Sequence, residues 1–149
     1  MATYNGQDNA IVQLDDTAGS LLDISDYVKD VKTDIETKIG RFSVLGKRFD
    51  PTTEGTAMVK GTMTVYGSVD AAGAHHIINH WLLNSIVNKA GLKSLRVQTP
   101  DAAVGSFQYD MEIRPGSYNL IVAAAGEANP GEHALALEVD GAPTWTVIT

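Results

Sequence analysis

The chain has 149 residues, 44% of them hydrophobic, which is the size of one globular domain with a single core. It contains no cysteine, which excludes disulfides, iron–sulfur clusters, thiolate zinc sites and cysteine nucleophiles. The formal net charge of −7 would repel phosphate backbones and disfavours ordinary nucleic-acid binding.

The chain opens with "MATYNGQDNA", which has neither the basic nor the apolar region of a signal peptide. No apolar run approaches the ~18 residues that span a membrane. We therefore expect a soluble protein without a membrane partner, made in a cytoplasm.

The segment after this opening predicts strands and one exposed excursion. "AIVQLDD" predicts a short strand that ends in a turn. Residues 21–38 have irregularly spaced apolar side chains, which we interpret as extended pieces broken near Ser25. Residues 41–57 are rich in glycine and proline and predict a long loop or a protruding hairpin, and such a loop usually has a function. Its Phe42, Leu45 and Phe49 suit a segment whose hydrophobic partner lies on another chain.

The second half of the chain predicts short strands separated by turn sequences, with one helix at about residues 71–89. The clearest strand is "SFQYDMEI", in which apolar and polar residues alternate. The other predicted strands are "VKGTMTVYG", "LKSLRVQT", "EHALALEV" and a closing "PTWTVIT". This pattern predicts a mainly β fold, a β-sandwich or barrel-like subunit with one flanking α-helix.

The predicted helix carries three histidines, which raises the question of a metal site. His76 and His80 are four residues apart and share a helix face, as zinc-binding histidines do. However, no carboxylate occurs from Ala71 to Gly91, and the distant His133 falls on the apolar face of a strand, where we interpret it as a packed residue. Nucleophile-elbow and phosphate-loop motifs are also absent. The sequence therefore predicts no enzyme, no metal and no cofactor.

The helix has two different faces instead. Counting from Ala74, apolar residues recur at the spacing of a stripe that faces a core. On the opposite side His76 and His80 flank two aliphatic residues, Leu83 and Val87. Aliphatics away from the core indicate a second contact surface, with another segment or another subunit, and we predict a subunit contact.

The order of these segments resembles the major tail tube proteins of long-tailed, non-contractile bacteriophages. The resemblance is carried by "LLDISDYVKDVKTDIETK", the loop in "VLGKRFDPTTEGTAMVKGTMTVYGSVD", the helix, and the ending "EHALALEVDGAPTWTVIT". It covers the chain from about Leu21 to the C-terminus.

The resemblance implies a structural virion protein. Six subunits would form a ring around a shared β-barrel, and stacked rings would form a phage tail tube that conducts DNA during ejection. Tail tip, tail terminator and tape measure proteins would be partners, with DNA in the lumen but not tightly bound. Residues 1–149 would be one tail-tube-like domain whose long loop and N-terminal and C-terminal arms reach neighbouring rings.

Two questions stay open at this stage. The carboxylates Asp110, Glu112, Glu132 and Glu138 face away from the core by strand alternation, and they either line the lumen or face solvent on the outside. We predict the lumen, because like charge on its wall would keep DNA from binding. A head-decoration protein, a tail terminator or another Ig-like virion or binding module remains the alternative function.

Overall fold

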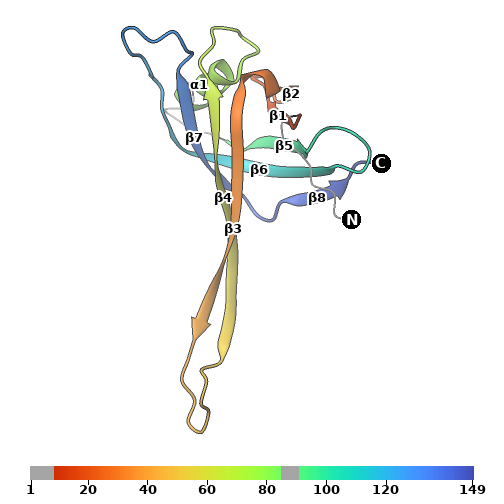
Figure 1. Ribbon diagram of the computed structural model, residues 1–149, viewed down its shortest axis with the longest axis vertical. Helices are drawn as coiled ribbons and strands as arrows, with labels where there is room; N and C mark the ends of the chain where they lie inside the picture. Colours follow the sequence, from red (N-terminus) through yellow and green to blue (C-terminus); the bar gives the residue numbers. More distant parts are fainter. Residues whose placement is uncertain (1–8, 85–90) are drawn as a thin grey trace.

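The computed structural model describes residues 9–84 and 91–149, which form a mainly β fold (Figure 1). The strands are β1 (Ile11–Asp15), β2 (Leu21–Asp23), β3 (Val28–Arg41), β4 (Thr52–Tyr66), β5 (Lys93–Thr99), β6 (Phe107–Tyr118), β7 (Glu132–Val139) and β8 (Thr144–Val147). The helices are the short 3-10 helix η1 (Ser25–Tyr27) and α1 (Ala74–Leu83). The predicted class, a β-rich subunit with one flanking α-helix, is confirmed.

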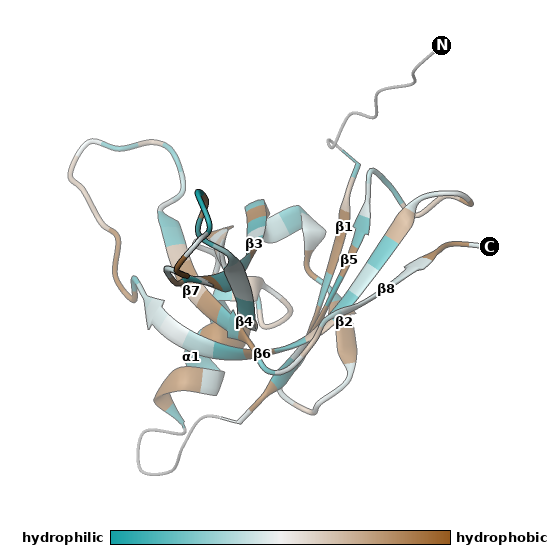
Figure 2. Cartoon of the chain, turned by 90° about the horizontal axis from the view of Figure 1, so that it is seen from below, coloured by the Kyte–Doolittle hydropathy of each residue, from teal (hydrophilic) through white to brown (hydrophobic). Residues whose placement is uncertain are grey.

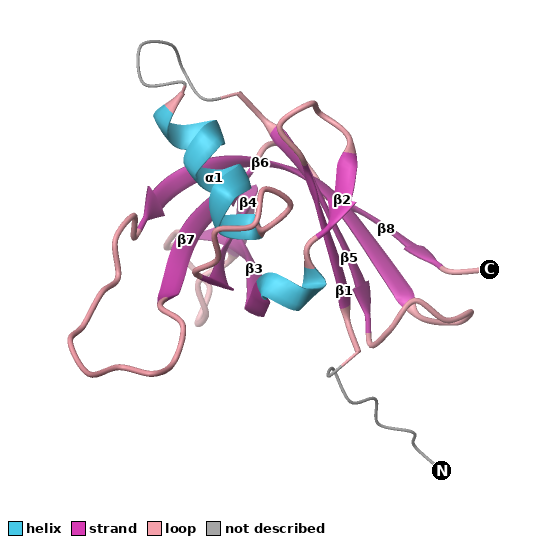
Figure 3. Ribbon diagram, turned by 90° about the horizontal axis from the view of Figure 1, so that it is seen from above, coloured by secondary structure: helices cyan, strands magenta, loops and turns pink. Residues whose placement is uncertain are grey.

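All described strands belong to one antiparallel sheet in the order β2-β1-β5-β6-β7-β4-β3, with β8 paired to β6. Strand β6 connects two halves, because its first part pairs with β5 and its last part with β7. The β1 half comprises β2, β1, β5, β8 and the first part of β6. The β4 half comprises β7, β4, β3 and the last part of β6. Seen from above, the two halves bend around a shared interior like the layers of a sandwich (Figure 3).

The core fills the space between the two halves and α1. Leu14 and Leu95 come from the β1 half, Met63 and Leu135 from the β4 half, and all four are almost completely buried. Helix α1 adds Ala74, Ile77, Ile78 and Trp81 to the same cluster. Burying side chains of this size stabilises the fold by about 1.5–3 kcal/mol each, which is why the alternating strands must keep this register.

The helix is shorter than predicted. It begins after Gly73, the N-cap residue, and has its C-cap at Asn84, so the predicted residues 71–73 lie outside it. The turn at 71–73 consists of small residues without a side-chain N-cap, and it precedes the first buried position of the core stripe. Residues 85–90, at the predicted end of the helix, lie outside the described residues.

Strands β3 and β4 form one long hairpin that projects far from the body (Figure 1). Of the two alternatives predicted for residues 41–57, the protruding hairpin is confirmed, and the loop itself is shorter than 41–57 because Arg41 ends β3 and Thr52–Ala57 belong to β4. The connecting loop covers residues 42–51. Residues 28–41 are rich in valine, isoleucine and threonine, which favour strands, although both faces of the projecting part are exposed and give no alternation.

The C-terminal strand β8 is held to the body rather than free. It pairs with β6, and Ile148 exchanges backbone hydrogen bonds with Gly105 and Ser106. The predicted arms stay a prediction, since residues 1–8 lie outside the described residues.

Candidate assembly surfaces

The projecting hairpin exposes more large hydrophobic side chains than a soluble single subunit needs. At its tip Phe42 is 49% exposed, Leu45 101% and Phe49 79%. Along the strands Ile35, Ile39 and Met58 are also exposed. All three predicted tip residues are thus available for contact, and their role in a subunit interface remains a prediction.

The tip of the hairpin is positively charged, although the chain as a whole is acidic. Arg41, Lys47 and Arg48 lie in or beside the loop, with Asp50 the one acid among residues 41–51. The Arg48 guanidinium lies 5.7 Å from the centre of the Phe49 ring, within cation–π range. The tip therefore combines positive charge with exposed apolar surface.

The outer face of α1 carries the residues predicted for it. His76 and His80 are exposed, and Leu83, one turn further, is 47% exposed. Spacings of four and three residues place these side chains on one face of the helix. Val87 lies outside the described residues, so the apolar part of this surface that the structure describes is Leu83.

The third helix histidine, His75, joins a buried polar cluster that the sequence did not predict. Its Nδ1 lies 2.5 Å from the Tyr118 hydroxyl, its Nε2 lies 3.1 Å from Asn79 Nδ2, and its ring centre lies 4.0 Å from that of His133. His133 is 4% exposed and bonds the backbone oxygen of Asn119, as expected for a packed residue. The cluster ties α1 to the facing ends of β6 and β7.

Burial shifts the pKa of His75 and of Tyr118. It lowers the pKa of His75, and the nearby His133 lowers that pKa further. Burial also raises the pKa of the Tyr118 hydroxyl. Both shifts favour the neutral form of the side chain. Within residues 9–84 and 91–149, no group of three or more histidines and carboxylates is arranged to hold a metal ion.

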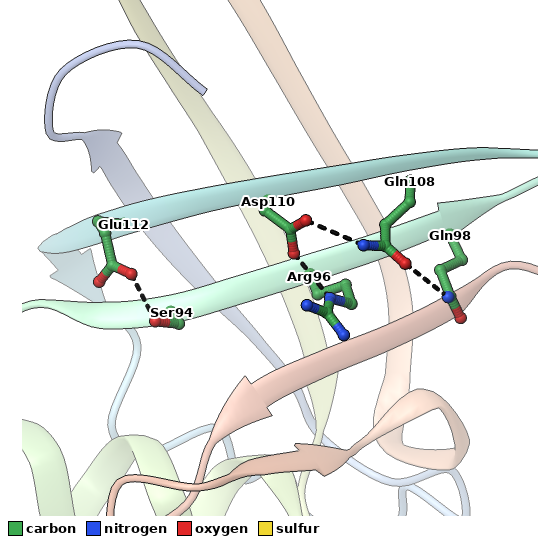
Figure 4. A network of polar contacts seen from close by, with 6 residues as sticks. All are labelled: Ser94, Arg96, Gln98, Gln108, Asp110 and Glu112. Atoms are coloured by element: carbon green, nitrogen blue, oxygen red, sulfur yellow. Dashed lines mark hydrogen bonds and ion pairs between the residues drawn. The ribbon is translucent and has the colours of Figure 1, made fainter. Parts of the chain in front are cut away.

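The face of β5 and β6 that points away from the core is a hydrogen-bonded polar network (Figure 4). Arg96 Nε donates to Asp110 across 2.7 Å, and Gln108 donates to the second oxygen of the same carboxylate. Gln98 donates to Gln108, and Ser94 donates to Glu112. The predicted acidic candidate Asp110 is thus paired with a cation and half-buried rather than free.

The other two acidic candidates lie on the β4 half. Glu132 forms an ion pair of 3.0 Å with Lys29, and this contact raises the pKa of that lysine. Glu138 is exposed and lies opposite both Arg114 and Lys60 in the strand register. Between them, the same face bears small side chains: Thr62, Thr64, Ala134 and Ala136. A shallow groove of about 390 Å³ follows these small residues.

The four acidic candidates share one face of a continuous, bent sheet. All four carboxylates lie on the non-core face of the sheet, but the core-facing sides of the two halves meet in one cluster. The two halves of the sheet bend away from each other, as the view along the hairpin shows (Figure 2). The acids at the junction stay close in the register, because Arg114, two residues after Glu112 on β6, lies opposite Glu138 on β7.

A groove of about 580 Å³ lies at the base of the hairpin. Val28, Asp30 and Val31 of β3 line one side. The opposite side is formed by β1, β5 and β6 through Val12, Val97, Tyr109 and Met111. Lys29 also lines the groove, but Glu132 already pairs with it. Asp26 of η1 is exposed and follows Ser25, another lining residue. The lining of the groove is thus mixed, polar and apolar, and Asp30 is the one acid among its lining residues.

Neither helix in the described residues has the length and apolar character needed to cross a membrane.

Comparison of sequences alone finds no relative: no family model and no curated protein matches the chain. Comparison of structures finds the same fold in tail and tube proteins. A chain from the tail of an empty gene transfer agent particle, determined with C6 symmetry, superposes with a TM-score of 0.67 and 13% identity, covering 97% of this chain and 100% of that one.

Two further structures share the fold, with TM-scores and sequence identities close to those of the first. The SPP1 tail tube matches with a TM-score of 0.72 and 12% identity over 97% of this chain and 80% of that one. The tube-terminating cap of the anti-feeding prophage matches with a TM-score of 0.72 and 15% identity over 99% of this chain and 93% of that one. The chain therefore has the fold of tail tube and tube-terminating proteins.

Proposed function

We propose that this chain is a structural virion protein whose subunits assemble into hexameric rings that stack into a phage tail tube. The observation that carries the proposal is the whole-length match to tube subunits, including one from a tail with C6 symmetry. The exposed apolar hairpin supports it, because a lone subunit has no use for such a projection.

The lumen of the proposed tube is formed by the β4 half. The centre of its outer face is built from small side chains around Thr62 and Ala136, with Lys60, Tyr66 and the two glutamates at its ends. On the β1 half, Ile11 lies opposite Gln98 and interrupts the polar face. Glu132 and Glu138 are then the lumenal acids, and Asp110 and Glu112 lie on the outside.

The charges on this wall suit a conduit for DNA. Lys60 is paired with Glu36 at 3.3 Å, and Arg114 lies 3.7 Å from Asp140. A phosphate group would have to break these pairs to use either of these two cations, which weakens the release of counterions that drives DNA binding. In this role the protein is a passive wall without catalytic function, and tape measure protein and DNA pass through it without tight binding.

Terminating a tube is the second candidate function, since the cap of the anti-feeding prophage matches as well as the SPP1 tail tube does. The two functions differ in how assembly ends. A tube subunit adds rings at its end without limit, whereas a terminator stops after one ring.

Negative-stain microscopy with analytical ultracentrifugation of the purified protein separates these outcomes. Stacked rings whose length grows with concentration support the tube. Single rings that do not grow would assign the terminator function, and a monomer at all concentrations would contradict both.

The lumen assignment has its own test in charge reversal. Tubes carrying Glu132→Lys and Glu138→Lys should retain DNA at low salt and release it steeply as salt rises, because each new cation adds to counterion release. Asp110→Lys with Glu112→Lys is the matched control on the outer face. Equal DNA retention inside tubes of both variants would refute the assignment.

A further inference from the structure

We infer that the stacked pair His75 and His133 is an acid-sensitive contact, which keeps the root of the loop at residues 119–131 closed at neutral pH and opens it when His75 takes up a proton. This property belongs to the single subunit, so it goes beyond the proposed function and holds whether or not the chain forms a tube.

The two imidazole rings meet at the root of this loop. Their centres lie 4.0 Å apart, with His75 on the first turn of α1 and His133 near the start of β7. His133 Nδ1 donates to the backbone oxygen of Asn119, the first residue of the loop, across 2.6 Å. At the other end of the loop, the Gly67 amide donates to the backbone oxygen of Gly131 across 2.8 Å. The histidine pair therefore lies where both ends of the loop are fixed.

The loop itself contributes nothing to the core. Residues 119–130 are all exposed, among them Leu120, Ile121 and Val122, and none belongs to the core cluster. Helix α1, in contrast, is anchored by buried residues such as Ile77 and Ile78. A segment without buried side chains opens at a lower free energy than the core does. If the two rings separate, we therefore expect the loop to move and the helix to stay.

His75 has no carboxylate partner in the part of the chain that the structure describes. Its two ring nitrogens contact the Tyr118 hydroxyl and the Asn79 amide nitrogen, and its ring lies against His133. Strand β4 places the uncharged Val65 opposite His133. Burial and the neighbouring His133 both lower the pKa of His75. A proton on His75 therefore creates an uncompensated charge, and separation of the rings with entry of water relieves it.

The charged groups on the neighbouring elements are paired elsewhere. On β7, Glu132 points to the opposite face of the sheet and forms an ion pair with Lys29 of β3. Before α1, the carboxylate of Asp70 accepts a hydrogen bond from the Tyr27 hydroxyl. Neither carboxylate compensates a proton on His75.

Asn79 provides the sharpest test, because it already lies beside His75. Its Nδ2 is 3.1 Å from His75 Nε2, and its Oδ1 is buried without a hydrogen-bond partner among the described residues. Asn79→Asp places a carboxylate of nearly the same shape at this position. The carboxylate favours the charged ring, so it should raise the pKa of His75 and keep the contact closed in acid.

Hydrogen exchange of the monomeric subunit at about pH 7.5 and about pH 5 tests the inference. The protection factors of the Gly67 and Asn119 amides should fall at least about ten-fold at the lower pH, because each pH unit between the ordinary histidine pKa and the lowered one shifts the opening equilibrium ten-fold. Protection of the Leu95 amide, on the central strand β5, should not change.

Three variants complete the experiment. His75→Gln removes the titrating ring and keeps a side chain that forms hydrogen bonds, so protection of the loop root should be equal at both pH values. Asn79→Asp should also stay closed at about pH 5, with a raised His75 pKa in an NMR titration. His80→Gln, on the exposed face of the same helix, is the matched control and should respond to acid as the unmodified chain does.

The inference is overturned if protection of Gly67 and Asn119 in the unmodified chain does not depend on pH. It is also overturned if Leu95 loses protection to the same extent, since the whole subunit then unfolds in acid and no local contact opens. A full response to acid in the Asn79→Asp variant, measured with a raised His75 pKa, would likewise contradict it.

Discussion

Replacing Leu45 and Phe49 by serine separates the stability of the subunit from the stability of the assembly. Leu45 is 101% exposed and Phe49 79% exposed, so neither contributes to the core of the single subunit. The free energy of unfolding of the subunit should change by no more than about 0.5 kcal/mol. Urea denaturation below the critical concentration measures it.

The effect on assembly should be large. Fully burying a leucine or phenylalanine side chain contributes about 1.5–3 kcal/mol, so with partial burial the two side chains together contribute about 2–4 kcal/mol per contact. This corresponds to a roughly 30- to 1000-fold rise in the critical concentration, measured by sedimentation. Val104→Ser, at 77% exposure outside the hairpin, is the control and should leave assembly unchanged. An unchanged critical concentration in the double variant would refute the contact role of the tip.

Three further predictions concern single sites. The lowered pKa of His75 means that the unfolded chain binds a proton more readily than the folded one, so stability is full at neutral pH and falls as pH drops below 6.5. His75→Gln should flatten this slope in urea titrations, and an unchanged slope would contradict the prediction. Gly61→Ala should lower the free energy of unfolding by about 1–3 kcal/mol, because a Cβ there would overlap the backbone oxygen of Lys32. Gly91→Ala is the control, since nothing lies within 4 Å of a Cβ at that position, and equal melting temperatures of the two variants would contradict the prediction. Leu83→Asp should leave a folded subunit that assembles poorly, and normal ring formation would remove α1 from the subunit contact.

Local alternation was enough to predict most strands of the body. In β6, Met111 and Ile113 are buried while Glu112 is exposed, as the pattern "SFQYDMEI" indicates. The apolar stripe of α1 that faces the core was predictable in the same way, because Ile77, Ile78 and Trp81 are buried at helical spacing. Burial on one face of an element leaves a periodic trace in the sequence, and these elements have one buried face.

The sequence of the projecting hairpin shows no such periodicity. Both faces of β3 beyond Val31 are exposed, so selection for burial imposes no alternation on them. Glycine and proline near residues 46 and 51 correctly indicated the turn, but the strands on either side are held by long-range pairing of β3 with β4, which local patterns do not encode.

The candidate site was predictable only in part. Exposure of the tip residues followed from composition, but the partner of each carboxylate did not, because Arg96 and Asp110 meet only through the register of β5 and β6. The same applies to the direction of the acids. Alternation placed all four opposite the core, while the bend of the sheet, which sets the direction of each acid, depends on the whole fold.

A cryo-EM reconstruction of the assembled protein tests the central claim most directly. The account predicts stacked six-fold rings with Glu138 on the lumen wall and the exposed apolar hairpin of each subunit in contact with another subunit. Rings that do not stack, or a tube whose wall facing the lumen carries Asp110 instead of Glu138, would contradict it.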